Sequence, residues 1–173
     1  MTRHAFLSLA LACLAFPACG RKKAPPFDPA PYETPAVAAT LRHVLNEAKE
    51  AGVAAKVGII VFGGKMHDST PAFRAQFADT GIDWHEGKDM TQVWVGPIAR
   101  VIERKSKLQP VQLQVSGVEL REPGQPGGPQ EITAAWAFED RMMRRRYAAT
   151  PGENGAWKIE PREIVEQKPA PQL

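Results

Sequence analysis

The pattern of hydrophobic and polar positions divides the chain into three parts. Residues 5–16 are apolar almost without a break, interrupted only by Ser8. Between Pro35 and Gly81, apolar residues recur three or four positions apart, the period of a helix, on either side of one short apolar run. From Val93 onward, apolar and polar residues mostly alternate, the period of a strand. The pattern predicts an apolar leader, a helical section and a sheet, in that order.

The helical section begins with a helix predicted over residues 35–50. Thr34 can cap it, Pro35 suits its first position, and Gly52 ends it. The apolar run at 57–62 then predicts a buried strand. One apolar stripe follows the length of the helix, formed by Val37, Leu41, Val44, Leu45 and Ala48.

A second, short helix shows the same signals at its ends. Thr70 can cap it, Pro71 occupies its first position, and Gly81 stops it. Phe73 and Phe77 are four residues apart and would lie on one face. The chain therefore has two predicted helices on either side of one predicted strand.

The strand section ends in a predicted antiparallel meander of four strands. Together with the helices, it predicts an α+β fold: an N-terminal helix and a short helix packed on a curved, mostly antiparallel sheet of four to five strands. The predicted features are an interrupted strand with Val93, Val95 and Val101, a strand at 111–120 bulged at Gly117, a Gly/Pro loop at 123–129, a strand pattern at 132–149, a hairpin turn at 151–155, and a closing strand with Trp157, Ile159 and Ile164.

Composition adds domain boundaries to this pattern. The 173 residues are 43% hydrophobic and 24% charged, which is typical of a globular chain, and the formal charge of +3 favours no class of partner. The sixteen prolines cluster near the start and at the end. We therefore expect a proline-rich tether at 19–33, a single domain at 34–167 and a disordered tail at 168–173.

The leader has the parts of a secretion signal. Arg3 precedes the apolar run, which is too short to span a bilayer as a helix, and Ala18 stands directly before Cys19. This arrangement resembles the lipobox of bacterial lipoproteins. The resemblance implies cleavage after residue 18 and acylation of the Cys19 thiol. Cys13, preceded by Ala-Leu-Ala, is the alternative site, although cleavage there would leave only a short apolar run.

The residues that follow carry a related resemblance. The segment 19–26, Cys-Gly-Arg-Lys-Lys-Ala-Pro-Pro, resembles the C-G-x-K-G-P-L opening of small proteobacterial lipoproteins. In that family a residue other than Asp after the cysteine, here Gly20, implies sorting to the outer membrane. We expect a protein attached to the membrane by covalent lipid, facing the periplasm. Three basic side chains would meet anionic headgroups there: Arg21, Lys22 and Lys23.

The closing strand carries a further resemblance. Gly155-Ala156-Trp157-Lys158-Ile159 resembles the G-x-W-K-I strand of nuclear-transport-factor-two-like and cystatin-like folds. In those folds a helix packs in the concave face of a curved sheet. Members range from enzymes to binding domains, so the resemblance bears on fold only.

Candidate chemistry is sparse. His67, His85 and Glu86 flank the second helix and are the candidates for a pocket or metal site, but neither segment has ligand spacing, so we expect solvated loops and no metal. The segment 58–65 superficially matches a phosphate loop but lacks the required Ser or Thr after its lysine. Both cysteines lie in the leader, which leaves the domain without thiol or disulfide chemistry. No catalytic residue and no cofactor is predicted.

The strongest charge cluster is a group of four arginines: Arg141, Arg144, Arg145 and Arg146. Side chains alternate along a strand, so Arg144 and Arg146 are expected on one face, together with Trp136 and Phe138. They are candidates for contact with anionic lipid, and the alternative is a solvated face.

Two functions remain open. The first is a non-catalytic binding or accessory domain of the cell envelope, whose partner is an envelope protein or anionic lipid rather than nucleic acid. The second is a small-ligand pocket domain of nuclear-transport-factor-two-like type. Some members of that fold are enzymes, so this alternative includes an enzyme. A filled core with an exposed apolar patch favours the first, whereas a deep apolar cavity with converging polar groups favours the second.

Overall fold

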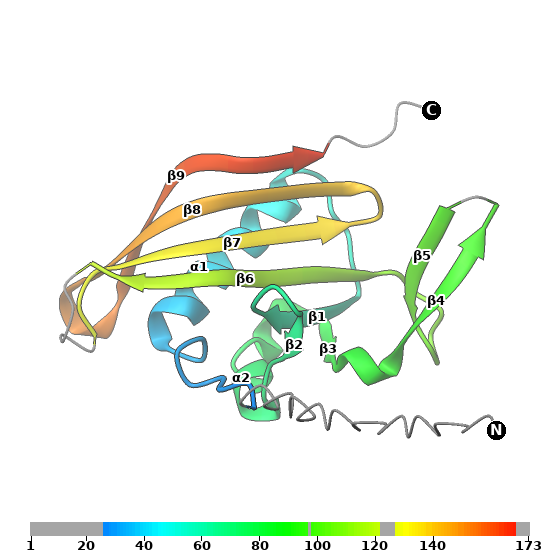
Figure 1. Ribbon diagram of the computed structural model, residues 1–173, viewed down its shortest axis with the longest axis horizontal. Coiled ribbons are helices and arrows are strands. Elements are labelled where there is room, and N and C mark those ends of the chain that lie inside the picture. Colours follow the sequence, from blue (N-terminus) through cyan, green and yellow to red (C-terminus); the bar gives the residue numbers. More distant parts are fainter. Residues whose placement is uncertain (1–25, 97, 122–126, 169–173) are drawn as a thin grey trace, which may run out of the picture.

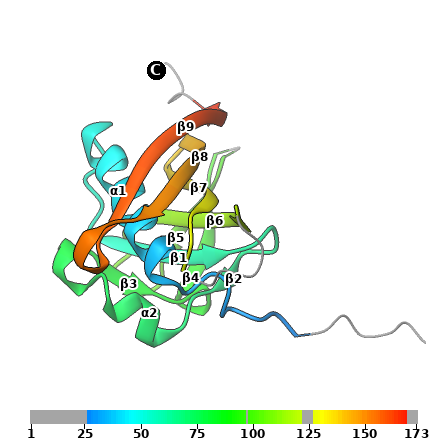
Figure 2. The same ribbon diagram turned by 90° about the vertical axis from the view of Figure 1, so that its left-hand side faces the viewer.

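A curved seven-stranded sheet with helix α1 (Pro35–Glu50) in its concave face forms the body of the molecule (Figures 1 and 2). The computed structural model describes residues 26–96, 98–121 and 127–168. The fold is α+β as expected, but the sheet has more than the expected four to five strands. Its strands are β1 (Val57–Phe62), β2 (His67–Asp68), β3 (Asp83–His85), β6 (Pro110–Leu120), β7 (Gln130–Phe138), β8 (Arg141–Pro151) and β9 (Trp157–Lys168).

The sheet is mixed rather than purely antiparallel. Strands β6 to β9 form the expected antiparallel meander, and the predicted bulge falls between Val115 and Gly117. Strand β1 adds to the meander by pairing parallel to β6, and its other edge is covered by β2 and β3. The two extra short strands raise the strand number above the prediction because two- and three-residue segments carry too little periodicity to be recognised.

Helix α1 has the predicted ends and the predicted buried face. The Thr34 hydroxyl accepts a hydrogen bond from the Val37 N–H at 3.3 Å, and Gly52 takes the left-handed conformation, with φ 82°, just past the C-terminal end. All five stripe residues are buried. The helix therefore packs on the meander through the stripe that the sequence predicted.

The second helical segment is shorter than a regular helix but keeps the predicted ends. Helix α2 (Pro71–Ala75) is capped by Thr70, a 3₁₀ turn η1 (Ala78–Thr80) follows, and left-handed Gly81 ends it. Phe73 and Phe77 are both buried in the core. Two further 3₁₀ turns are η2 (Gly87–Asp89) and η3 (Glu153–Gly155), the second within the predicted hairpin turn.

The predicted interrupted strand is a separate hairpin. Strands β4 (Met90–Val95) and β5 (Ile98–Glu103) pair only with each other, in a two-stranded antiparallel sheet that stands away from the body (Figure 1, right). The expected interruption is the hairpin turn, where Gly96 has φ 60°. We call these two strands the β4–β5 hairpin.

The end of the expected tether lies against the domain. The Phe27 ring stacks on His67 with 4.0 Å between ring centroids, and the Tyr32 ring stacks on Phe62 at 5.4 Å. Both aromatic residues pack against the main core. The packed unit therefore begins by Phe27, earlier than the predicted boundary at 34, and at the other end β9 includes Lys168, the first residue of the predicted tail.

The predicted anchor lies outside the described residues. This applies to Cys19 and to the alternative Cys13, to the basic residues Arg21, Lys22 and Lys23, and to the tail from 169. None of the helices in the described ranges is long and apolar enough to cross a membrane.

Candidate functional site

The concave face of the sheet is occupied by α1. Leu41 and Val44 of the helix lie in one buried cluster with Leu113, Trp136 and Tyr147 of three successive strands. Each of these side chains is at most 5% exposed. A ligand cavity in a fold of this kind would have to lie between the helix and the sheet, whereas here the side chains of the helix and of the strands pack together in one buried cluster.

A polar cluster ties the helix to β8 at the edge of this core. The Glu47 carboxylate accepts hydrogen bonds from the Tyr147 hydroxyl at 2.5 Å and from the Arg145 guanidinium at 2.8 Å. Burial, reinforced by the Glu47 charge, raises the pKa of Tyr147, so its hydroxyl stays protonated and keeps donating. All three groups are engaged with one another, which makes the cluster a structural link between helix and sheet.

His67, His85 and Glu86, the residues predicted for a pocket or metal site, lie on or next to the short strands β2 and β3 that pair with β1. Each of them contacts a different side chain. His85 lies beside Asp83, 3.0 Å from its carboxylate, and Glu86 binds the buried Arg74 at 2.7 Å. His67 is stacked under Phe27 instead. Within residues 26–96, 98–121 and 127–168, no three His, Cys, Asp or Glu side chains are grouped so that they could hold a metal ion.

Glu86 is held as a carboxylate by its basic neighbours. The Lys88 ammonium, 2.6 Å from the carboxylate, lowers the pKa of Glu86, and Arg74 adds to the effect. Glu86 also begins η2 in a reciprocal capping arrangement with Asp89. These contacts give Glu86 a role in shaping the turn.

The segment resembling a phosphate loop is a strand with a packing glycine. Gly58 lies inside β1, and a Cβ there would be 2.5 Å from the Trp84 ring. Gly63 ends the strand in the left-handed conformation. Gly63 therefore ends the strand, whereas Gly58 makes room for Trp84.

The arginines alternate faces, but not as expected relative to the aromatic residues. The pattern at 132–149 is two strands joined by a tight turn at Glu139 and Asp140, so that Phe138 pairs with Arg141 and Trp136 with Met143. Directly paired residues share a face. Arg144 and Arg146 therefore lie on the face opposite Trp136 and Phe138, and the prediction that they share one face is wrong.

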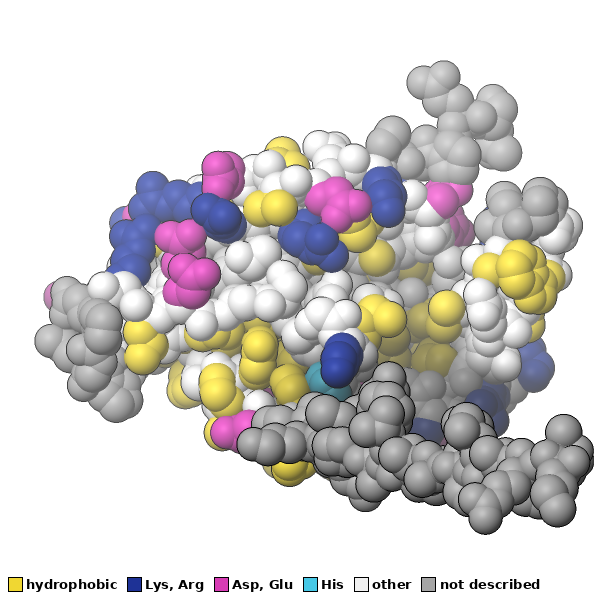
Figure 3. Space-filling view, viewed as in Figure 1, with side chains coloured by type: hydrophobic (Ala, Val, Ile, Leu, Met, Phe, Trp, Pro, Cys, Tyr) yellow, Lys and Arg dark blue, Asp and Glu magenta, His cyan; other side chains and the backbone are white. Residues whose placement is uncertain are grey.

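That face of the sheet is convex, and its arginines are paired with carboxylates. Arg144 lies 2.8 Å from Glu166, and Arg146 lies 2.8 Å from Glu163 and 3.8 Å from Glu131. Figure 3 shows charges of both signs gathered over this part of the surface. The guanidinium groups are already neutralised by neighbouring strands, which makes them weaker candidates for anionic lipid.

The most unusual surface of the molecule is the β4–β5 hairpin. Trp94 is 70% exposed, Val95 55% and Val101 44%. Hydrophobic side chains gather there in the space-filling view, at the right of Figure 3. Sequence reasoning assigned these residues to a strand of the main sheet and so missed the site. The signal was the apolar run Val93 to Val95 followed by Gly96, with no polar residue in it.

The base of the hairpin is firmly built. Glu103 is 2% exposed, and its carboxylate accepts hydrogen bonds from the backbone N–H of Lys105 at 2.9 Å and of Ser106 at 2.5 Å. These two bonds, the Lys105 bond first, lower the pKa of Glu103 to about 2. The Arg104 guanidinium donates to the Met90 carbonyl across the hairpin at 2.9 Å. The base of the hairpin is thus closed by its own hydrogen bonds, around the buried Glu103 and Met90.

The comparisons with known proteins bring no relative. No protein-family model matches the chain, and no curated protein and no solved structure is significantly similar to it. The resemblances to lipoprotein leaders and to nuclear-transport-factor-two-like folds stay predictions from short motifs. Function has to be inferred from the surfaces described above.

Proposed function

We propose that this chain is a lipid-anchored protein of the bacterial cell envelope whose domain is a non-catalytic binding or accessory module. The anchor is the Cys19 thiol, and the domain faces the periplasm from the outer membrane. The domain binds through an exposed surface rather than an enclosed pocket. Its binding surface is the β4–β5 hairpin.

The observation that carries this proposal is the contrast between a filled core and an exposed apolar hairpin. Helix α1 packs directly on the concave face of the sheet, and Leu41 and Val44 are fully buried in the core between them. Trp94 meanwhile exposes most of its ring to water. Exposing an apolar patch to water is unfavourable in free energy. The patch therefore favours a function in which a binding partner covers this surface.

A small-ligand pocket has less support. The hollow between β5 and the β7–β8 turn has a volume of about 150 Å³ and is lined by Val101, Phe138 and Asp140 among others. This volume is below the usual range for sites that hold small-molecule ligands, about 300 Å³ or more. It is more simply the gap left where the hairpin joins the body. Two larger hollows, of about 470 Å³ beside Ile82 and Trp84 and of about 500 Å³ beside Arg121 and Arg146, are shallow and open to solvent rather than enclosed.

The anchor is tested by labelling with fatty acid. In a Gram-negative host that makes the full chain, Cys19→Ser should abolish incorporation of labelled fatty acid and leave the leader uncleaved, because the acyl-accepting thiol is lost. Cys13→Ser is the matched control and should be labelled normally. The proposal fails if Cys19→Ser is still acylated, and loss of label in Cys13→Ser alone would move the anchor to Cys13.

A further inference from the structure

The β4–β5 hairpin is apolar on both of its faces near its tip. Trp94 pairs with Ala99 and shares one face with Val101, two positions further along β5. Val95 and Val93 lie on the opposite face, because side chains alternate along a strand. A partner protein with a flat surface would cover only one of these faces. A medium that surrounds the tip on all sides, as the interfacial layer of a lipid bilayer does, covers both.

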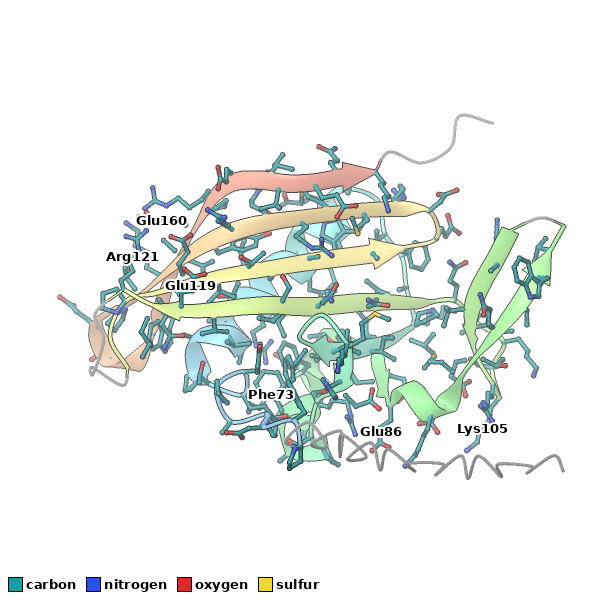
Figure 4. All side chains as sticks on the ribbon, viewed as in Figure 1. Phe73, Glu86, Lys105, Glu119, Arg121 and Glu160 are labelled. Atoms are coloured by element: carbon teal, nitrogen blue, oxygen red, sulfur yellow. The ribbon has the colours of Figure 1, made fainter. Side chains whose placement is uncertain are left out.

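The charges of the hairpin complement an anionic lipid surface. Arg100 lies on β5, and Arg104, Lys105 and Lys107 follow in the turn to β6. Figure 4 labels Lys105 at the base of the hairpin. The acidic Glu103 among them is buried and hydrogen-bonded. No ion pair joins these four cations to a carboxylate in the described part of the chain, unlike Arg144 and Arg146 on the sheet. Each such cation near anionic headgroups is attracted to them.

The length of the chain before the domain sets the distance to the membrane. Seven residues separate Cys19 from Phe27, and Phe27 is packed on the domain. In extended polyproline conformation they span about 25 Å. Each strand of the hairpin has six residues, which makes it about 20 Å long. An anchored domain is therefore held close enough for the hairpin tip to reach the same bilayer.

We propose that the tip of the β4–β5 hairpin inserts into the interfacial layer of the bilayer that carries the anchor, with Trp94 and Val95 among the headgroups and Arg100 on anionic phosphates. Tryptophan prefers this layer because its ring is apolar and its N–H can still find a partner. Insertion stays shallow, because the outer edges of a two-stranded sheet present unpaired backbone groups that hydrocarbon cannot satisfy. This inference rests on the proposed function, because it uses the lipid anchor and tether. It goes further by identifying the binding partner of the hairpin as the lipid bilayer itself.

The test uses the full chain reconstituted in vesicles. The two native cysteines lie in the leader, so in a Cys13→Ser background the acylated chain accepts a thiol-reactive fluorophore only at an introduced cysteine. Val95→Cys places an environment-sensitive fluorophore at the tip. Lys158→Cys, on β9 in the body, is the matched control, because Lys158 is also largely exposed, at 72% of its side chain.

In vesicles containing phosphatidylglycerol, we expect the emission of the fluorophore at 95 to shift to the blue, to be quenched by brominated lipid and to be protected from iodide. The fluorophore at 158 should show none of these changes. Adding Trp94→Ser should reduce the lipid quenching at 95, whereas adding Leu120→Ser, which removes an exposed apolar residue elsewhere, should leave it unchanged. Circular dichroism of both variants checks that the fold is kept.

Three outcomes would overturn the inference. Equal access of iodide to both positions would mean that the hairpin remains in water. Protection at 95 without quenching by lipid, increasing with the density of protein in the vesicle, would assign the hairpin to contact between copies. Equal quenching at 95 and 158 would mean that the body, not the hairpin, lies on the membrane.

Failure of the anchor is recognised separately. If the chain keeps its leader instead of being acylated at Cys19, mass spectrometry of its N-terminus shows an uncleaved leader, while the apolar leader still holds the chain on the vesicle. A Cys13→Ser, Cys19→Ser, Val95→Cys chain then carries a single thiol, and its fluorophore reports hairpin insertion without the acyl chains. Loss of acylation with quenching retained would refute the anchor and leave the hairpin inference standing.

Discussion

The β4–β5 hairpin and the β6–β9 meander each expose at least one face to water, but they differ in the side chains on that face. The convex face of the meander presents arginines paired with carboxylates, such as Arg144 with Glu166. The hairpin presents Trp94 and Val95 on its two faces. Because the meander buries its apolar side chains under α1, its outer face is free to be polar. Among the described residues, none buries the outer part of the hairpin, which still keeps apolar residues such as Trp94 exposed.

The edges of the two regions differ in the same way. The outer edge of β9 carries Pro161, which has no N–H to offer, and its register with β8 shifts between Arg144 and Tyr147. Charged Glu160 and Arg162 flank the proline. Figure 4 shows Glu160 with Glu119 and Arg121 at the end of the sheet far from the hairpin. Such an edge resists pairing with another chain. Strand β4 of the hairpin, with the sequence MTQVWV, has neither a proline nor a charged residue, which favours contact with a partner.

The largest expected effect comes from comparing two tryptophans. Trp136 is 5% exposed in the core, and Trp94 is 70% exposed on the hairpin. Trp136→Ala should lower the free energy of unfolding by about 3–5 kcal/mol, because it leaves a large cavity. Trp94→Ala should change it by less than about 0.5 kcal/mol, as for an exposed site. Urea unfolding of the two variants measures both. A large loss for Trp94→Ala would assign that ring to folding and remove the contrast.

Acid titration should distinguish the base of the hairpin from the rest. The pKa of Glu103 is lowered in the folded protein to about 2, and an unfolded glutamate titrates near 4.5. The folded state therefore binds fewer protons in this window, so the contribution of Glu103 is present above pH 4.5 and is lost as pH falls toward 2. We expect the amide proton resonances of Lys105 and Ser106 to titrate with a midpoint near pH 2.

The matched control for this titration is Glu103→Gln. It keeps the size of the side chain but has no charge to lose, so both amide resonances should stay constant across the same window. A midpoint near 4.5 in the unchanged protein would mean that the carboxylate does not hold the turn. The hairpin would then be a loose element rather than one closed at its base by its own hydrogen bonds.

The smallest effect is expected from the arginines of the sheet. Replacing Arg144 and Arg146 by Gln removes exposed ion pairs, which should change the free energy of unfolding by no more than about 1 kcal/mol per pair. In the vesicle assay, the lipid quenching of the fluorophore at 95 should be reduced less by this double change than by Arg100→Gln on the hairpin. The reverse order would favour the arginines of the sheet, the candidates named from the sequence, over the hairpin as the lipid-binding surface.

Local elements could be predicted because their signals are local. Thr34, Pro35 and the apolar stripe define α1 without reference to the rest of the chain. Thr70 and Gly81 do the same for the second helical segment. The bulge near Gly117 was visible as a slip in alternation. Each of these signals depends on residues within one or two turns or strand positions.

The candidate site was missed because the apolar run Val93 to Val95 does not show which other segment, if any, covers it. Alternation at Val93 and Val95 predicts a strand but not the sheet that it joins. Likewise, the face on which Arg144 lies depends on the tight turn at Glu139. The turn pairs Trp136 with Met143, so Arg144 lies on the face opposite Trp136. One residue more or less in a turn exchanges the faces of everything beyond it.

By itself, the sequence determined the helices and the order of the long strands, since each depends on contiguous residues, and the leader around Cys19 stays a prediction of the same local kind. Tertiary structure alone decided that β1 pairs with β6, about fifty positions further along the chain. With β1 in that place, the β4–β5 hairpin is left outside the sheet. Whether an apolar side chain is buried depends on which distant segment covers it, and for Trp94 no segment in the described part of the chain does so.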